Sequence, residues 1–441
     1  MFLAKLSKLY RDIVPLEIRK LFQLGYRYGM FKEYVYISTI QIKHKKALRK
    51  LKKKDKINCV FFALFDSVWK YDNVYRLMAD HPRFEPIILV CPVVNYGKDN
   101  MIIRMNEAYE FYKQRGYNVI KSYDNEHDSY IDVKKELNPD IVFYTNPYGT
   151  LIDKRYFITN FRDVLTVYVP YSINNSSAFE ANYNLILYNL LWRHYLPTNY
   201  HLDYSVRYAR NKGVNSVVSG YPGIESLIDQ HSYSCMDWKL NDTGLKKIIW
   251  APHHTIEPVG IVYYSCFIRY YDFMIDMAIK YKEKVQFVFK PHPLLKNKLY
   301  LKWGKEKTDE YYLKWESMPN TNLNDGDYED LFLSSDAMIH DSGSFISEYL
   351  YVNKPVMRTL NEVDESDKMN GFAMECIANH YLAYNENDIE QFIQNVINDI
   401  DPLKKQRTDF IENKLMPNSS PSQTIINDIL DSIDNQILYR N

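Results

Sequence analysis

Cysteine is scarce in this sequence of 441 residues, and its placement excludes several classes of protein. The five cysteines lie far apart and form no Cys-x-x-Cys pair; they are Cys59, Cys91, Cys235, Cys266 and Cys376. Neither a disulfide framework nor a cysteine-based structural zinc site is therefore indicated. The simplest interpretation is a protein of a reducing, cytoplasmic environment.

Long apolar runs are also absent. No stretch approaches the roughly 18 consecutive apolar residues that indicate a membrane-spanning helix. The N-terminal stretch "MFLAKLSKLYRDIVPLEIRKLF" is charged throughout and has no small-residue cleavage site, so it does not predict a signal peptide. The sequence predicts a protein that stays inside the cell.

The net charge is zero, but the two signs are distributed unevenly. Residues 1–56 contain 16 Lys and Arg against 4 Asp and Glu, which leaves a net charge of −12 on the remainder. Apolar residues recur at helical spacing among these lysines, so we predict a basic helical arm. Such an arm suits the anionic inner face of the cell membrane, where each basic residue contributes about 1 kcal/mol. A solvated helix packed on its own domain is the alternative, and the acidic body argues against a nucleic-acid partner.

Past residue 56 the sequence alternates short strand-like runs with helix-compatible segments. The first series of strand-like runs is 57–65, 86–94, 117–122, 140–147 and 165–171. A second series begins with "KKIIWAPHH" and comprises 246–254, 285–293, 335–344 and 354–358, with a helix predicted at about 262–281. This pattern is typical of βα units around parallel sheets. We therefore predict two Rossmann-like domains, 57–240 and 241–400, followed by helices in 401–441.

Polar side chains stand where three strand-like runs of the second series end. They are Lys290 and His292 in "FVFKPHP", His253 and His254 in "IIWAPHH", and His340 and Asp341 in "AMIHDSGS". Ligands of open α/β sheets bind in the crevice beyond the carboxyl ends of the strands. The clustering of imidazoles at three such ends predicts a binding site there.

The stretch "HDSGSFISEYLYV" predicts a strand, a tight turn and a helix that begins near Phe345. Ser342, Gly343 and Ser344 would then offer backbone N–H groups and hydroxyls to phosphate oxygens at a helix N-terminus. Glu348 lies one helical turn beyond Ser344, within reach of a ribose diol. Ordinary capping of the helix is the structural alternative.

These motifs resemble a known family. "DYEDLFLSSDAMIHDSGSFISEYLYVNKPVMR" (327–358), preceded by "FVFKPHP", is similar to the CDP-glycerol glycerophosphotransferases, the teichoic-acid and capsule polymerases. The order of elements agrees over roughly 246–400. The resemblance implies a glycosyltransferase-B fold, with two Rossmann-like domains facing a cleft.

The resemblance also implies roles for single residues. His292 would contact the donor pyrophosphate, Ser342 and Ser344 would bind phosphate, and Glu348, where the family usually has Asp, would bind the ribose. The reaction implied is attack of an acceptor hydroxyl on the β-phosphorus of a CDP-linked donor, with release of CMP.

The first domain departs from the family pattern. The family's Trp-His-Gly motif corresponds to "VYVPYSIN", with Pro170 and Tyr171 and no histidine. The family's Pro-Arg-Asn-Asp and Pro-Thr-Trp-Arg segments correspond to "GYPGIE" (220–225) and "APHHTI" (251–256), both without arginine. These departures indicate a divergent member with a different acceptor or a different CDP-linked group.

We therefore expect Lys290 and His292, with the Ser342–Ser344 turn, to stabilise the leaving phosphate, and His340 to lie at the donor site. The candidate general base is His253 or His254, with Asp341 as its orienting partner. No Asp-x-Asp pair stands at a strand end, so no essential metal or other cofactor is expected beyond the CDP-linked donor substrate. The acceptor would be a cell-surface glycan or a lipid-linked molecule.

Three alternatives stay open. A metal-dependent hydrolase could use the same histidines and Asp341, because imidazole and carboxylate groups ligate zinc. A glycosyltransferase that uses a nucleotide sugar would share the cleft. A non-catalytic scaffold fits the missing first-domain histidine. Asn146 and Tyr148, which end "DIVFYTNPYG", could face the acceptor or simply form a loop turn.

Overall fold

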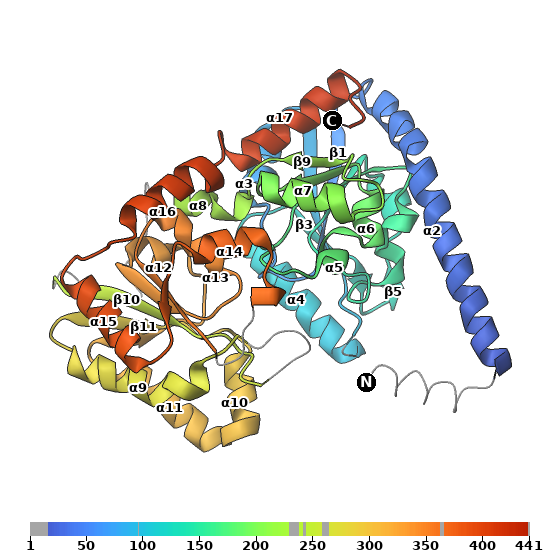
Figure 1. The fold of residues 1–441 in the computed structure, drawn as a ribbon. Helices are drawn as coiled ribbons and strands as arrows, with labels where there is room; N and C mark the ends of the chain where they lie inside the picture. Colours follow the sequence, from blue (N-terminus) through green and yellow to red (C-terminus); the bar gives the residue numbers. More distant parts are fainter. Residues whose placement is uncertain are drawn as a thin grey trace.

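The computed structural model describes residues 16–95, 97–228, 238–240, 244–257, 264–361 and 366–439. The first 15 residues of the predicted arm and Cys235 lie outside these ranges, as do residues 229–237 and 241–243 near the predicted domain boundary and the start of the helix predicted at 262–281. The described chain forms two α/β domains side by side, with a long helix reaching away from the first (Figure 1).

The first domain is built on a parallel sheet of seven strands in the order β3-β2-β1-β6-β7-β8-β9. The strands are β1 (Ile57–Ala63), β2 (Phe84–Val90), β3 (Val119–Lys121), β6 (Ile141–Tyr144), β7 (Leu165–Tyr168), β8 (Arg193–Leu196) and β9 (Ser216–Val218). The helices are α3 (Asp72–Asp80), α4 (Lys98–Gln114), α5 (Phe179–Tyr183), α6 (Ile186–Leu190) and α7 (Asn199–Tyr208). β1, β6 and β7 are almost entirely buried, because helices cover both faces of the sheet, and their sequences are correspondingly continuous apolar runs.

Short elements complete this domain. They are the hairpin β4 (Tyr123–Asp124) and β5 (Ser129–Tyr130), and the single turns η1 (Val133–Leu137), η2 (Lys154–Tyr156) and η3 (Ile158–Asn160).

The second domain is built on a parallel sheet of six strands in the order β12-β11-β10-β13-β14-β15. The strands are β10 (Lys246–Ala251), β11 (Val285–Phe289), β12 (Thr321–Leu323), β13 (Ala337–His340), β14 (Val356–Thr359) and β15 (Tyr381–Ala383). The helices are α9 (Phe267–Lys280), α10 (Leu295–Trp303), α11 (Lys305–Ser317), α12 (Glu329–Ser334), α13 (Phe345–Glu348), α14 (Gly371–Ile377) and α15 (Glu386–Ile397), with the short turns η5 (Tyr349–Val352) and η6 (Ser366–Lys368). In each domain the strand order reverses beside the first strand, which is the Rossmann arrangement, so the predicted fold class is confirmed.

The two domains meet over a continuous apolar contact and a set of hydrogen bonds. Ile173, Leu196 and Tyr221 of the first domain share one buried cluster with Tyr264 and Phe372 of the second. The loop 174–177 also pairs with 367–370, since the backbone N–H of Ser177 donates to the carbonyl of Lys368 at 2.8 Å. This loop therefore fixes the first domain against the second beside the cleft.

The C-terminal helices return to the first domain. After η4 (Pro222–Ile224) and α8 (Glu225–Ile228) near the domain junction, the chain runs through the second domain to α16 (Lys404–Phe410) and η7 (Ile411–Leu415), and then to α17 (Pro421–Asp434). Ile425, Ile429 and Ile433 of α17 belong to the first-domain core. Figure 1 shows α17 lying across that domain beside α3.

Two buried polar groups hold α17 in this position. The carboxylate of Glu225 accepts hydrogen bonds from Asn73 Nδ2 at 2.9 Å, from the Ser420 hydroxyl at 2.6 Å and from the Ser422 backbone N–H at 2.8 Å. Arg193, fully buried on β8, donates to Asp428 Oδ2 of α17 at 2.8 Å. Residues 421–434 are thus structurally part of the first domain.

Helix α2 (Leu16–Leu51) forms most of the predicted arm. Its last turns belong to the first domain, because Ile40, His44, Leu48 and Leu51 are buried there while the lysines between them face solvent. Its earlier part extends beyond the domain (Figure 1) and leaves Phe31 64% exposed. In the described part of the chain, no helix is long and apolar enough to cross a membrane.

Candidate functional site

A cavity of about 510 Å³ lies between the two domains, at the carboxyl edges of both sheets. Its second-domain wall is formed by the loops after β10, β11 and β13, and its first-domain wall by the loops after β6 and β7 and by β8. The switch points of both sheets therefore face one space, where ligands of this fold class bind. We treat it as the candidate active site.

A larger cavity of about 880 Å³ lies elsewhere between the domains, near the end of η7 and the start of α17. Its lining includes four carboxylates, namely Asp72, Glu225, Glu329 and Asp330. Because these negative charges repel a polyphosphate, this cavity is the less suitable donor site.

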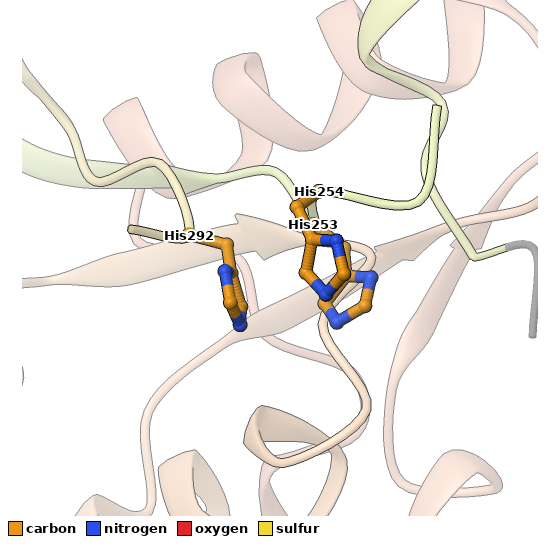
Figure 2. A group of neighbouring side chains, drawn as sticks. All are labelled: His253, His254 and His292. Atoms are coloured by element: carbon orange, nitrogen blue, oxygen red, sulfur yellow. The ribbon is translucent and has the colours of Figure 1, made fainter. Parts of the chain in front are cut away.

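Three imidazoles meet in the smaller cavity (Figure 2). His253 and His254 follow β10, and His292 follows the neighbouring β11. The ring centre of His254 lies 4.3 Å from that of His253 and 4.2 Å from that of His292. Two of the three predicted strand ends thus bring their histidines together, whereas His340, at the third, does not line the cavity. That they form a binding site stays a prediction.

The hydrogen bonds of two of these rings determine which nitrogen carries the proton. Nδ1 of His292 accepts the backbone N–H of Leu294 at 3.1 Å. Nδ1 of His253 accepts the backbone N–H of Thr255 at 3.3 Å and lies 2.8 Å from the Thr255 hydroxyl, which itself accepts the backbone N–H of Tyr264. A neutral imidazole that accepts at Nδ1 holds its proton on Nε2. His253 and His292 therefore each offer an Nε2–H donor.

All three rings are neutral near pH 7. Burial, together with the neighbouring His254 and His292 and the cations Arg358 and Lys298, lowers the pKa of His253 to about 2. Burial likewise lowers the pKa of His254 to about 4 and that of His292 to about 3. An uncharged imidazole is thus the resting state of each.

The same hydrogen bonds bear on metal binding. The ligand atoms of the three histidines all lie within 4.8 Å of one another, which is close enough for one ion. Coordination through Nε2, however, would move the proton of His253 and His292 to Nδ1, where the backbone N–H groups of Thr255 and Leu294 already point. The rings are therefore arranged to donate to an oxyanion rather than to ligate a cation, which disfavours the metal-dependent hydrolase.

The Ser342–Ser344 turn forms the floor of the cavity beside the imidazoles. Ser344 stands at the N-cap of α13 but makes no capping hydrogen bond through its side chain, so the capping alternative is not what the structure shows. Helix α13 is one turn long and continues as η5, so the helix dipole expected from the sequence is small. A Cβ on Gly343 would lie 3.1 Å from the Tyr264 ring, which shows how closely the turn approaches its neighbour.

Four predicted site residues do not line the cavity. Lys290 is 7% exposed and donates through Nζ to Asn324 Oδ1 at 2.8 Å and to the Gly326 carbonyl at 2.7 Å. It therefore holds the loop after β12, and its charge reaches His292 only through space. The expected direct contact between Lys290 and a phosphate is not seen in this geometry.

Asp341 and His340 are buried outside the cavity lining. The Asp341 carboxylate accepts the backbone N–H groups of His253 and Cys266, so it positions the backbone of His253 rather than its ring. His340 is 1% exposed, and its ring centre lies 5.4 Å from that of His380.

Glu348 also lies outside the cavity lining. It is 3% exposed, and its Oε2 accepts the Tyr328 hydroxyl at 2.8 Å. Burial raises the pKa of this carboxyl, while Lys70 of the first domain acts in the opposite direction. Its expected contact with a ribose stays a prediction.

The first-domain wall contains residues that sequence reasoning missed. His194 on β8 lines the cavity, its ring stacks 4.9 Å from that of Tyr188, and burial lowers its pKa to about 3. Asn175 donates through Nδ2 to the Gly343 carbonyl at 2.9 Å and to the Ser347 hydroxyl at 3.1 Å. The apolar and aromatic run "LLWRHYLP" (190–197) was the available signal for His194, whereas Asn175 had none.

Tyr171, Tyr148 and Asn146 have distinct places. Tyr171, at the position of the family's missing histidine, and Tyr148 both line the cavity. Asn146 accepts the backbone N–H of Tyr148 at 2.8 Å, which is the loop turn that the sequence left open.

Two Rossmann-like domains that face one ligand cavity define the class of protein, which is the glycosyltransferase-B type. Within this class, the sequence model of the CDP-Glycerol:Poly(glycerophosphate) glycerophosphotransferase family matches residues 173–426, more than half of the chain. The chain belongs to this family, as its motifs predicted, and is an enzyme of the CDP-glycerol glycerophosphotransferase type. No curated protein matches it in sequence.

Three solved structures illustrate the similarity of fold. A variant of the wall teichoic acid polymerase TagF has a TM-score of 0.55 and 14% identity, covering 93% of this chain and 99% of that chain. The MnaA–UDP structure from S. aureus has a TM-score of 0.52 and 16% identity, covering 88% and 99%. UDP-GlcNAc 2-epimerase from Neisseria meningitidis has a TM-score of 0.51 and 15% identity, covering 85% and 100%. At such identities the likeness shows the fold alone.

Proposed function

We propose that the protein transfers a polyol-phosphate group, such as glycerol phosphate, from a CDP-linked donor to a hydroxyl of a cell-surface glycan or lipid-linked acceptor. The observation that carries this proposal is the pair of Nε2–H donors on His253 and His292, which line one cavity with the Ser342–Ser344 turn in the family-matched part of the chain. Neutral donors at this position suit the oxygens of a pyrophosphate.

In the reaction, the acceptor oxygen forms a bond to the β-phosphorus of the donor. The bond from that phosphorus to the bridging oxygen breaks, and CMP leaves with the electron pair. His292 and His253 would hydrogen-bond the phosphate oxygens on which negative charge accumulates. No step requires a metal ion or another cofactor.

The acceptor proton must pass to a nitrogen that carries none. His253 presents a proton at Nε2, so it fits a donor role better than the predicted role of base. His194 supplies an imidazole from the first-domain wall of the cavity, and burial keeps this ring neutral and so able to accept a proton. We assign the acceptor side to His194 in place of the missing first-domain histidine.

The experiment is release of CMP from CDP-glycerol, CDP-ribitol and a UDP-sugar in the presence of glycan or lipid-linked acceptors. We expect release from one CDP-linked donor, with loss of activity in His292→Ala and Ser344→Ala. His127→Gln is the matched control, since His127 is an exposed first-domain histidine. Turnover of the UDP-sugar alone would favour the glycosyltransferase, and a folded protein that binds no CDP would refute the proposal.

The exposed part of α2 supports a place at an anionic membrane surface. Phe31 and Tyr34 are 64% and 70% exposed, with the exposed Lys32 between them in the sequence and Lys45 and Lys46 exposed further along the same helix. Such a combination favours the interface of anionic lipid. Sedimentation with phosphatidylglycerol vesicles should exceed that with phosphatidylcholine vesicles and should fall in Phe31→Glu. Equal sedimentation with both lipids would contradict the membrane placement.

A further inference from the structure

The cavity has an electrostatic feature that a polyphosphate site does not usually show. Among the described residues that line it, no side chain is Lys, Arg, Asp or Glu, whereas five are histidines. The five are His194, His201, His253, His254 and His292. A CDP-linked donor carries two negative charges on its pyrophosphate. The lining therefore contains no fixed positive charge to oppose them.

Placing uncompensated charge in a partly dry cavity is costly. Hydrogen-bond donors on His253, His292 and the Ser342–Ser344 turn reduce this cost but leave the net charge unchanged. The groups of the lining that can become positive near neutral pH are its imidazoles. Donor binding and protonation of an imidazole are therefore linked.

His254 is the ring best placed to accept that proton. Its neighbours His253 and His292 already donate through Nε2, so protonation of either would add a proton at Nδ1, facing the backbone N–H group that now points there. Nδ1 of His254 is buried and makes no hydrogen bond with the residues that the structure describes. A proton at this nitrogen therefore opposes no existing hydrogen bond.

The charged and titratable groups around the three rings raise or lower the pKa of the imidazoles. From the second domain the neighbouring charged or titratable groups are Lys290, Lys298, Arg358, Asp341 and Tyr264. From the first domain they are Tyr148, Tyr171, His194 and His201. Burial first, and the nearby cations second, keep the empty cluster neutral, and Asp341 is engaged by two backbone N–H groups. One negative charge about 4 Å from an imidazole raises its pKa by about three. The two charges of the donor therefore outweigh the combined effect of burial and the cations, which lowers the pKa of His254 to about 4.

We propose that the His253–His254–His292 cluster is a pyrophosphate site that becomes positively charged only when the donor is bound, by taking up one proton at His254. This inference rests on the proposed function, because it requires a CDP-linked substrate in this cavity. In the empty enzyme the cluster is neutral, so free cations and free anions are both weakly attracted. The positive charge forms only together with the bound pyrophosphate.

The test is isothermal titration calorimetry of the full-length protein with CDP-glycerol, in the absence of acceptor. Both phosphates of CDP-glycerol are diesters, so the ligand itself does not titrate near pH 7. Titrations at pH 7.0 in Pipes and in Tris, whose ionisation enthalpies differ, give the number of protons taken up. We expect about one proton per CDP-glycerol, and a Kd that rises up to tenfold per pH unit between pH 6.5 and 8.

His254→Gln should bind CDP-glycerol more weakly at pH 6.5 and should reduce proton uptake to near zero, while His127→Gln should match the wild type. Binding whose heat is the same in both buffers would overturn the proton linkage and leave the proposed function intact. Proton uptake that persists in His254→Gln would overturn the assignment to His254. Absence of CDP-glycerol binding would overturn the inference together with the proposed function.

Discussion

The hydrogen bond at His292 Nδ1 permits a substitution that separates three chemical roles of the ring. The side-chain amide of asparagine lies near the position of imidazole Nδ1, and that of glutamine near Nε2. In His292→Asn the amide oxygen can still accept the Leu294 N–H, but the donor at the Nε2 position is lost. In His292→Gln an amide N–H donor is retained near the position of Nε2.

The size of the effect follows from the bond that is removed. A hydrogen bond to a charged group contributes about 1.5–3 kcal/mol, which corresponds to roughly 10- to 150-fold in rate or affinity. We therefore expect kcat/KM for CMP release to fall by about that factor in His292→Asn and to stay within about fivefold of the wild type in His292→Gln. The assay is initial-rate CMP release, with the free energy of unfolding measured in urea to confirm that both variants fold.

Two results would refute this reasoning. If His292→Gln were as inactive as His292→Ala, the ring would act as a base or a metal ligand, since glutamine supports neither role well. If His292→Asn retained full activity, Nε2 would not contact the substrate at all. Elemental analysis of the purified wild type distinguishes the base from the metal ligand in the first case.

Two further predictions concern stability. Asp428→Asn leaves the buried Arg193 without its carboxylate partner and should lower the free energy of unfolding, measured in urea, by about 3–5 kcal/mol. The double variant Arg193→Met with Asp428→Leu should lower it by less, because no unpaired charge stays buried. An equal decrease in both variants would show that the unpaired charge is not the cause. Burial lowers the pKa of His44 and of His380 to about 3, below the value of about 6.5 in the unfolded chain, so the unfolded state alone gains protons as the pH falls below 6.5. The contribution of these histidines to the free energy of unfolding is therefore fully present above pH 6.5 and should fall by about 2 kcal/mol per histidine by pH 5. A His44→Gln variant whose free energy of unfolding depends on pH as steeply as that of the wild type would contradict this.

Much of the fold could be predicted from the sequence because the longer strands are continuous apolar runs. β1, β2, β10 and β11 fall within or closely overlap the predicted segments. The strands that were missed, namely β4, β5, β8, β9, β12 and β15, have two to four residues each, although the similarly short β3, β6, β7, β13 and β14 were predicted. Such short strands form because neighbouring strands and helices complete their hydrogen bonds and burial, which single-sequence patterns do not express.

The site was predictable to the extent that strand ends determine it. His253, His254, His292 and the Ser342–Ser344 turn follow directly from the rule that carboxyl ends of parallel strands converge. Lys290 also follows a strand end, but its side chain donates to Asn324 in the loop after β12 and does not line the cavity. Asn175 and His194 come from the other domain, so only the packing of the two domains brings them to the site.

The return of α17 to the first domain has a mechanical consequence. The chain crosses between the domains twice, once after Glu225 and once before Ser420, and the carboxylate of Glu225 joins the two crossings. The second domain is therefore joined to the first at two separate places, at Glu225 and at loop 174–177 beside the cavity. The position of His194 and Asn175 relative to the imidazoles depends on both.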